Sequence, residues 1–386
     1  MRVAIVHEWL ATYAGSERVL EQLIACFPEA DVFSVVDFLP EESRGFLQGR
    51  PVRTSFIQKL PFARRAFRHY LALMPLAVEQ FDLSGYDLVL SSSHAVAKGV
   101  LTGPDQFHIS YIHSPMRYAW DLQHQYLRET KLDRGLKSAL VRWMLHRLRL
   151  WDARTATGVD VFVANSRYIA RRIKKTYGRD SVVVPPPVDV DSFTPSRDKE
   201  DFFLVVSRFV PYKRVNLVVE AFAAMPEHRL VVVGDGPERA RVRAAARGAP
   251  NIEFRGEAPQ EELVRLTRRA RAVLCAAEED FGISMVEAQA CGTPVIAYGR
   301  GGARDIVVDL DAERPTGLFF EPQNAEAIAR AVRQFEVVGG RITVEACREN
   351  ALRFSRAKFR SRMLALVEDS LYGVPGVLGV PERARA

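Results

Sequence analysis

The stretch of sequence that decides the fold is CAAEEDFGISMVEAQACGTPVIAYGRGGARD, from Cys275 to Asp305. The apolar residues just before it and the run Thr293–Tyr298 each predict a buried strand, with a helix between them that closes at Cys291-Gly292. Gly301-Gly302 then predicts a tight turn. A strand, a helix and a second strand in this order are typical of an α/β domain with a parallel sheet.

Two glutamates in this stretch are candidates for ligand contact. If the helix begins near Gly282, Glu279 lies on the loop above it and Glu287 lies on its second turn. The unpaired amides of the first turn favour negative charge, and carboxylates accept hydrogen bonds from hydroxyl groups. A sugar joined to a nucleotide diphosphate offers both kinds of group. The alternative, a helix with solvated acids, is disfavoured by the flanking strands and by the glycines at either end.

These residues also carry a resemblance to a known family. Glu279-Asp280-Phe281-Gly282 with Glu287 is similar to the E-x-F-G-x-x-x-x-E signature of the retaining glycosyltransferases of family 4. The resemblance implies an α/β fold of the GT-B type, with two Rossmann-like domains facing across a cleft. It also implies that five residues of this stretch bind the donor, namely Asp280, Phe281, Gly282, Ile283 and Glu287.

The length of 386 residues predicts two domains. The best boundary is Pro185-Pro186-Pro187-Val188-Asp189, because three prolines continue neither a strand nor a helix. We therefore expect an N-terminal acceptor-binding domain at 1–188 and a C-terminal nucleotide-sugar-binding domain at 189–353. The remainder, 354–386, is expected to hold a helix over Phe354–Tyr372 that crosses back to the first domain, and a mobile tail from Gly373.

Composition excludes several classes of protein. Hydrophobic residues make up 48% of the chain and charged residues 26%, as in soluble globular proteins. The four cysteines have no metal-ligand spacing and are expected to be buried thiols in a reducing compartment. No apolar run approaches the length of a membrane span, and the N-terminus lacks the features of a signal peptide. We expect a cytoplasmic protein, with peripheral attachment to the inner face of the membrane as a further hypothesis.

The first domain contains two candidate site residues. Gly15 opens a helix after the strand Val3–Val6, where its amide is placed to meet a phosphate. His113 ends the predicted strand Phe107–Ile112 and begins the motif HSPMRYAWD. That motif is similar to one in a subset of family 4 that includes bacterial mannosyltransferases building surface polysaccharides from GDP-mannose. The resemblance implies that His113 contacts the transferred sugar.

Two cations follow the first strand of the second domain. Arg208 and Lys213 come just after the run Phe202–Ser207, where positive charge is well placed to meet a diphosphate. Each of them alone is more often ordinary surface charge. As a pair opposite the acidic loop at Glu279, they are expected to be functional. We therefore predict four catalytic residues, His113, Arg208, Lys213 and Glu279.

The net charge of +7 indicates an anionic partner. Arg64, Arg65 and Arg68 lie among Phe62, Phe67 and other apolar residues at helical spacing, which predicts a basic amphipathic helix for an anionic membrane surface. The alternative is a solvated face over ordinary core residues. A second basic block runs from Lys131 to Arg154. No nucleic-acid partner is expected, because no recognised binding module accompanies either block.

The predicted reaction transfers a hexose, first of all mannose from GDP-mannose, to a hydroxyl of a polyprenyl-linked or other glycan acceptor, with retention at the anomeric carbon. Neither a metal nor another cofactor is expected. A UDP-sugar such as UDP-glucose is the alternative donor. Two other classes of function are disfavoured alternatives. A nucleotide-sugar epimerase with two Rossmann domains lacks the paired glutamates, and a protein that only binds a nucleotide sugar or an anionic lipid does not need these polar residues together.

Overall fold

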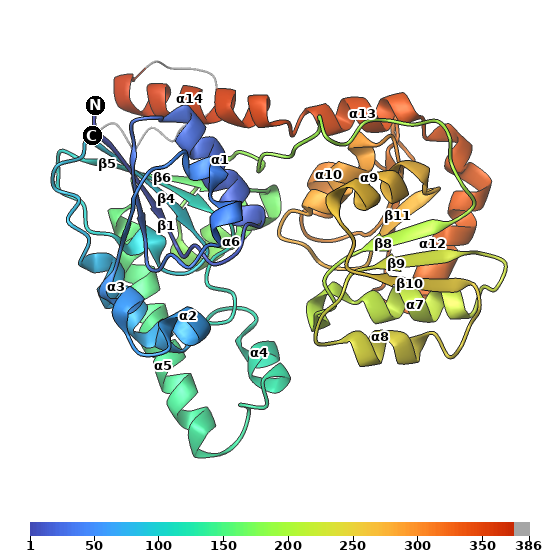
Figure 1. Ribbon diagram of the computed structural model, residues 1–386, viewed down its shortest axis with the longest axis horizontal. Helices are drawn as coiled ribbons and strands as arrows, with labels where there is room; N and C mark the ends of the chain where they lie inside the picture. The colour runs from blue at the N-terminus through green and yellow to red at the C-terminus, as the bar shows by residue number, and fades with distance from the viewer. Residues whose placement is uncertain (374–386) are drawn as a thin grey trace. The chain divides into compact units, whose positions relative to one another are not determined.

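The computed structural model describes residues 1–373 and divides them into two compact units. Of the described residues, the first unit contains Met1–Pro187 and 359–373, and the second contains Val188–Lys358. The predicted mobile tail lies outside the described residues, except for Gly373 itself. Figure 1 shows each unit as a sheet flanked by helices.

The first unit is built on a parallel sheet in the order β3-β2-β1-β4-β5-β6-β7. Its strands are β1 Val3–His7, β2 Asp31–Ser34, β3 Val52–Thr54, β4 Leu88–Ser93, β5 Phe107–Ile112, β6 Val161–Ala164 and β7 Val182–Val183. Its helices are α1 Gly15–Cys26, α2 Ala63–Ala66, α3 Met74–Glu79, α4 Gln123–Glu129, α5 Gly135–Thr155, α6 Arg167–Tyr177 and α14 Arg356–Tyr372.

Both faces of this sheet are buried, which explains why residues 3–6 of β1 and residues 88–90 of β4 are apolar runs. Val3 and Ile5 of β1 pack in a core with α1 and with Phe359 of α14. Ala4 and Val6, which alternate with them, pack in a second core with α3 and α5. The period of two along the strand thus supplies both layers of the domain.

The second unit repeats this plan, with the order β10-β9-β8-β11-β12-β13. Its strands are β8 Phe203–Val206, β9 Leu230–Val233, β10 Ile252–Gly256, β11 Ala272–Cys275, β12 Val295–Tyr298 and β13 Gly317–Phe320. Its helices are α7 Val215–Ala223, α8 Arg239–Ala245, α9 Gln260–Arg269, α10 Ile283–Ala290, α11 Ala303–Ile306, α12 Ala325–Val338 and α13 Val344–Leu352. The prediction of two doubly wound parallel-sheet domains is confirmed.

Two expectations about the basic segment near Phe62 are wrong. The chain forms the four-residue helix α2 and then the 3-10 helix η4 (Phe67–Leu73), so no continuous amphipathic helix exists there. Phe67, expected with Phe62 to face the membrane, is buried and packs against Trp9 in a tilted arrangement, with 5.5 Å between ring centroids. The physical reason is that its side chain packs in the hydrophobic core that contains Ala4 and Val6 of β1, so it is not part of the exposed surface of this segment. Phe62, by contrast, is 81% exposed.

The cysteines differ in part from the expectation. All four are unpaired, as predicted, but only Cys291 and Cys347 are buried, whereas Cys26 and Cys275 are half-buried. Burial raises the pKa of the Cys291 and Cys347 thiols to about 12. These two thiols are therefore protonated at neutral pH and have the environment of core residues. Within residues 1–373, none of the helices is long and apolar enough to span a bilayer.

Candidate active site

The predicted residues of the second unit lie where its sheet changes direction. Strands β8 and β11 are neighbours, and the chain order runs outward from them on opposite sides. Loops that follow two such strands diverge, and ligands of α/β proteins bind at that point. Arg208 and Lys213 follow β8, whereas Glu279 follows β11. Residues about 70 positions apart in sequence therefore reach one edge of the sheet.

Lys213 and Glu279 form an ion pair at this edge. The Lys213 Nζ donates a hydrogen bond to Oε1 of Glu279 over 2.5 Å. The two side chains are only 22% and 12% exposed. Burial alone would favour the neutral amine, but the charge of Glu279 outweighs it, and the pKa of Lys213 is raised. The pair thus keeps both charges in a partly desolvated site.

Arg208 has a different environment. Its side chain is exposed, and its guanidinium makes no hydrogen bond or ion pair with any residue of the described range 1–373. A guanidinium presents five N–H donors in a planar fork that matches phosphate oxygens. One edge of the sheet therefore holds a balanced Lys–Glu pair and a second cation that is available to an anion.

The acidic loop is held by direct backbone contact with the turn that follows β12. The Gly302 amide donates to the Glu279 carbonyl over 2.7 Å. A Cβ on Gly301 would lie 2.3 Å from the same carbonyl oxygen, so a larger residue does not fit. Gly282 adopts φ +111° and caps α10, which begins at Ile283. The Gly-Gly turn therefore fixes the position of Glu279.

The remaining predicted residues of this loop differ in what they can offer a ligand. Phe281 is buried and packs against Phe354, so only its backbone is available to a ligand. Asp280 and Ile283 are half-buried. Glu287 is half-buried on the second turn of α10, at the place that the sequence predicts.

The first unit has an equivalent edge, where β1 and β4 are neighbours at the change of direction. His7 ends β1, Ser92 lies near the end of β4, and His113 follows β5. The Nε2 of His113 lies 2.9 Å from Oγ of Ser92. Asn165, which follows β6, donates to the His113 carbonyl over 2.9 Å. Burial, the largest cause, lowers the pKa of His113 to about 3, so this ring is neutral at neutral pH.

Gly15 is the first residue of α1, where its amide has no acceptor within the helix. The turn before it is fixed by Glu17, which is 3% exposed. The Oε2 of Glu17 accepts from the Ala14 amide over 2.9 Å and from the Ser16 hydroxyl over 3.0 Å. Burial acts to raise the pKa of Glu17, but the hydrogen bond with His7 and the bonds from backbone amides outweigh it, and the pKa of Glu17 is lowered.

Sequence reasoning missed Glu8, a fully buried carboxylate beside this edge. Its Oε1 accepts from the Ser93 hydroxyl over 2.9 Å, and its two oxygens accept from four consecutive amides, those of residues 94–97. Although burial acts to raise the pKa of Glu8, the charge of His94 and these amides lower it. The only signal in the sequence was a carboxylate directly after an apolar strand.

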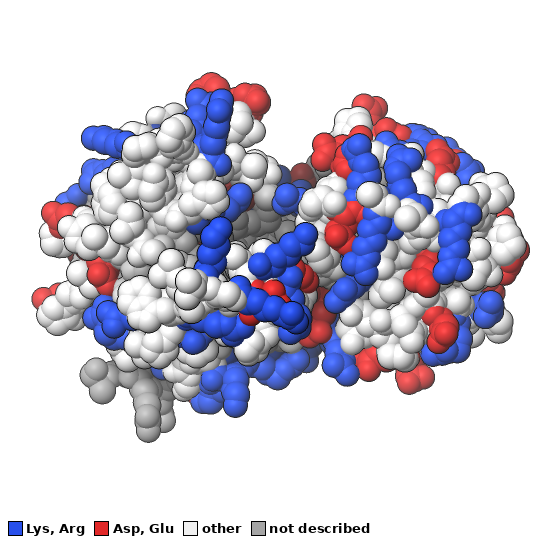
Figure 2. Space-filling model, turned by 90° about the horizontal axis from the view of Figure 1, so that it is seen from below, with Lys and Arg blue, Asp and Glu red and all other residues white. Residues whose placement is uncertain are grey.

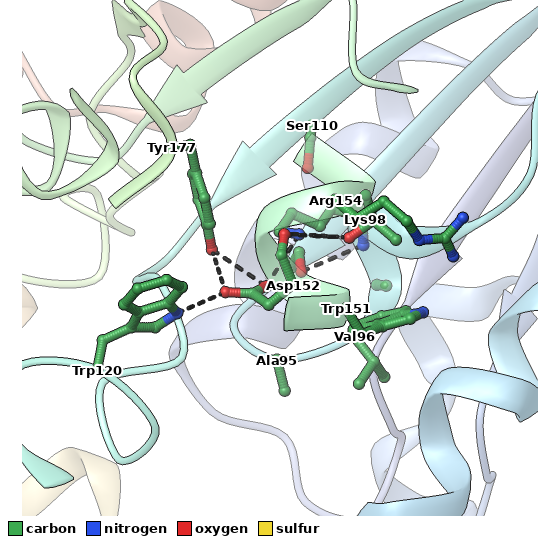
Figure 3. A network of polar contacts seen from close by, with 12 residues as sticks. Ala95, Val96, Lys98, Ser110, Trp120, Trp151, Asp152, Arg154 and Tyr177 are labelled. Atoms are coloured by element: carbon green, nitrogen blue, oxygen red, sulfur yellow. Dashed lines mark hydrogen bonds and ion pairs between the residues drawn. The ribbon is translucent and has the colours of Figure 1, made fainter. Parts of the chain in front are cut away.

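A buried ion pair anchors the motif that begins at His113. Lys98 Nζ lies 2.9 Å from Oδ1 of Asp152, and both side chains are almost completely inaccessible to solvent. Asp152 also accepts from Trp120 Nε1 over 2.7 Å and from the Tyr177 hydroxyl over 3.1 Å, as Figure 3 shows. Asp121 is bound by the guanidinium of Arg172. Trp120 and Asp121 therefore hold the motif in place.

Two family models match this chain. The model described as "Glycosyltransferase Family 4" matches residues 13–192, and the one described as "Glycosyl transferases group 1" matches residues 189–353. The chain belongs to glycosyltransferase family 4. The earlier resemblance, based on Glu279 to Glu287, is confirmed, and with it the GT-B fold of two Rossmann-like domains.

Curated relatives are similar over about half of the chain. A D-inositol 3-phosphate glycosyltransferase of Thermomonospora curvata is 31% identical, and the match covers 51% of this chain and 57% of the relative. A GDP-mannose-dependent monoacylated alpha-(1-6)-phosphatidylinositol monomannoside mannosyltransferase of Corynebacterium glutamicum is 30% identical over 45% of this chain and 52% of the relative. The chain therefore spans about half the length of the curated relatives it matches.

Solved structures share the fold over nearly the whole chain. The Anabaena protein HepE, crystallised with UDP and glucose, superposes with a TM-score of 0.67 at 16% identity. The superposition covers 95% of this chain and 99% of that one. At this identity the likeness establishes the architecture of both units.

Proposed function

We propose that the protein transfers a hexose, with retention, from a nucleotide diphosphate sugar to a hydroxyl of a lipid-linked glycan. The observation that carries this proposal is the set of charges at the β8/β11 edge. Arg208 has no partner in the described chain, and Lys213 and Glu279 are paired beside it. This edge offers donors to a diphosphate and an acceptor to sugar hydroxyls, and membership of family 4 supports the same reaction.

The difficult step of such a reaction is departure of the nucleoside diphosphate from a sugar that develops positive charge. Arg208, Lys213 and the amides at the start of α10 are proposed to stabilise the leaving phosphate by fixed electrostatics. Glu279 would hold hydroxyls of the transferred sugar, and Glu287 the hydroxyls of the ribose. Following the family precedent, the leaving phosphate itself would take the proton of the attacking hydroxyl.

GDP-mannose is the proposed donor. The motif from His113 to Asp121 supports it, and two relatives are named as GDP-mannose-dependent mannosyltransferases. A UDP-sugar is the second candidate, because the Anabaena protein of the same fold was crystallised with UDP and glucose. The base-contacting residues decide between them, and no sequence motif identifies those residues.

Ligand-induced thermal stabilisation tests the donor directly. A ligand that binds only the native state raises Tm. At a concentration of one hundred times its Kd it adds about 2.7 kcal/mol to the free energy of unfolding. GDP-mannose is expected to raise Tm more than UDP-glucose, UDP-galactose or free mannose at equal concentration. If only UDP-sugars raise Tm, the proposed donor is wrong but the proposed type of reaction stands. If no nucleotide sugar raises Tm, the proposed function is contradicted.

A lipid-linked acceptor requires contact with a membrane, and two exposed surfaces of the first unit support such contact. Arg64, Arg65 and Arg68 are exposed beside Phe62. Helix α5 exposes Leu136, Leu140, Trp143 and Leu150, with exposed fractions of 92%, 65%, 62% and 53%. These four recur at spacings that place them on one face.

Charge on α5 suits an anionic bilayer. The exposed residues of α5 include Lys137, Arg147 and Arg154 and no acid, because Asp152 points into the core. Figure 2, which is seen from below the view of Figure 1, shows Lys and Arg side chains on this side of the molecule with Asp and Glu side chains among them. We propose that this outer face of α5 enters the interfacial region, with the arginines after Phe62 as additional cationic contacts.

A further inference from the structure

A continuous line of hydrogen bonds joins a buried carboxylate to the histidine that ends β5. Glu17 Oε1 lies 3.4 Å from Nε2 of His7, and Nδ1 of His7 lies 3.1 Å from Oγ of Ser92. The same Ser92 oxygen lies 2.9 Å from Nε2 of His113. Glu17, His7 and Ser92 are 3%, 0% and 0% exposed, so within the core water does not compete for these bonds.

The direction of every bond in this line follows from counting protons. The other oxygen of Glu17 already accepts from the Ala14 amide and the Ser16 hydroxyl, as expected of an ionised carboxylate that can only accept. His7 must therefore donate from Nε2. If its ring is neutral, its Nδ1 accepts, and the Ser92 hydroxyl donates to it. Ser92 then has only lone pairs to offer His113, which must donate from Nε2.

Two observations favour the neutral state of His7. Its bond to Glu17 is 3.4 Å long, whereas charge-assisted N–H···O bonds are typically about 2.7–2.9 Å. A charged His7 would also lie, fully buried, in a cluster that includes His94 and His113, whose charged forms it disfavours. If His7 were charged, both of its nitrogens would donate, and the direction of the Ser92–His113 bond would reverse.

We infer that Glu17, His7 and Ser92 are positioning residues that fix His113 as the Nε2–H tautomer and leave its Nδ1 as a hydrogen-bond acceptor. The Nδ1 of His113 has no hydrogen-bond partner within residues 1–373. This nitrogen therefore recognises a hydroxyl that donates, and it does not stabilise an anion. The inference rests on the proposed function for one detail, that the hydroxyl belongs to the transferred sugar.

The tautomer can be measured without any substrate. The chain has eight histidines, so 15N-histidine labelling and long-range 1H–15N correlation give a countable set of rings. The His113 signals are assigned by their loss in His113→Gln. At pH 7 we expect a protonated Nε2 and an unprotonated Nδ1 on His113. A protonated Nδ1, on either a neutral or a charged ring, would overturn the inference.

Two variants test the line itself. Ser92→Ala removes the acceptor, so the His113 ring should change to a mixture of tautomers. Glu17→Gln supplies an amide that can donate to Nε2 of His7. Every hydrogen bond in the line can then reverse, and the proton of the His113 ring should move from Nε2 to Nδ1. Ser91→Ala is the matched control, because Ser91 lies beside Ser92 in β4, is also buried, and bonds a histidine of β5, His108, over 2.8 Å. Unchanged His113 signals in Ser92→Ala, or an equal change in Ser91→Ala, would contradict the line.

Kinetics supply a second readout that depends on the proposed function. Ser92→Ala should lower kcat by about 2- to 12-fold, the value of one neutral hydrogen bond. Because Ser92 acts through His113, the double variant Ser92→Ala/His113→Gln should be no slower than His113→Gln alone. Additive losses would show that Ser92 acts by another route. If no transfer is found but the predicted tautomer is seen, the proposed function fails and the positioning line stands.

Discussion

Lys213 and Glu279 show how single residues set the character of the candidate site. The two were predicted separately, as a phosphate contact and a sugar contact, and the structure pairs them. A half-buried pair holds each charge at low cost only while both partners are present. A ligand that separates the pair must therefore offer bonds to both groups, which the phosphate and the sugar hydroxyls of the proposed donor would do.

The two glutamates of the E-x-F-G-x-x-x-x-E stretch should respond differently to substitution. Glu279→Gln is expected to lower kcat with a smaller change in donor KM, because its proposed partner changes shape and charge in the transition state. Glu287→Gln is expected to raise donor KM and leave kcat near wild type. Each effect should be about ten- to 150-fold, from about 1.5–3 kcal/mol for a hydrogen bond to a charged group.

Steady-state kinetics with varied donor at saturating acceptor measure this difference. Both variants must first show the wild-type Tm, since Glu279 is paired with Lys213 and Glu287 lies within α10. A KM defect in Glu279→Gln with intact kcat, or the reverse pattern in Glu287→Gln, would show that the two roles are exchanged or wrong.

At the scale of elements, buried carboxylates hold the loops at the carboxyl ends of the first sheet. Glu8 binds the turn at residues 94–97, which leads into the 3-10 helix η5 (Ala97–Gly99). Asp152 of α5 binds Lys98 of the same 3-10 helix, as well as Trp120 and Tyr177. The side chains of Glu8 and Asp152 therefore connect the strand ends with α5 and with the motif that begins at His113.

Glu8→Gln should destabilise the first unit by roughly 3 kcal/mol or more, because several bonds to a buried charged acceptor are lost and an amide N–H is turned toward N–H donors. The pKa of Glu8 is lowered in the folded state, so its contribution is present above the unfolded value of 4.5 and is lost as the pH falls through the folded pKa. The Tm difference from wild type should therefore shrink below about pH 4.5. Glu41→Gln, at a 94% exposed side chain, should stay within about 0.5 kcal/mol. A constant difference down to pH 3 would contradict this account.

Asp152→Asn should cost about 3–5 kcal/mol, because it leaves the Lys98 ammonium buried without a countercharge. Burial already lowers the pKa of Lys98 against the opposing charge of Asp152. Adding Lys98→Met should recover part of the loss. Chemical denaturation of the two single variants and the double variant measures the coupling. The exposed pair Lys174–Asp180 is the control, for which Asp180→Asn should cost about 0–1 kcal/mol. Equal costs at the two pairs would contradict the argument.

At the scale of the whole molecule, the excess of positive charge has two proposed uses, a leaving phosphate and a membrane. Arg208 and Lys213 are proposed to supply near the phosphate the charge that a divalent cation would otherwise bring. We expect turnover to survive excess EDTA. Loss of activity in EDTA that is restored by Mg²⁺ or Mn²⁺ would contradict this prediction.

Membrane attachment should depend on charge and on the outer face of α5. Co-sedimentation with vesicles containing phosphatidylglycerol is expected, and it should weaken with salt. Substituting Arg64, Arg65 and Arg68 by Ala should cost about 1 kcal/mol for each arginine near the surface. Leu140→Ser with Trp143→Ser should weaken binding further. Val337→Ser, at an 84% exposed apolar residue of the second unit, should have no effect. Binding unchanged by the arginine and α5 substitutions would contradict this location.

The sequence by itself determined the class of fold, the paired glutamates and the position of His113 at the end of a strand. Those features are local: apolar runs, Gly turns and polar residues at strand ends follow from backbone sterics and burial within a few residues. Only the tertiary structure decided that Lys213 bonds Glu279, that Phe67 is buried, and that Glu17, His7 and Ser92 lead to His113. Contacts between residues 66 or 85 positions apart depend on which strands become neighbours, and that order results from packing of the whole domain.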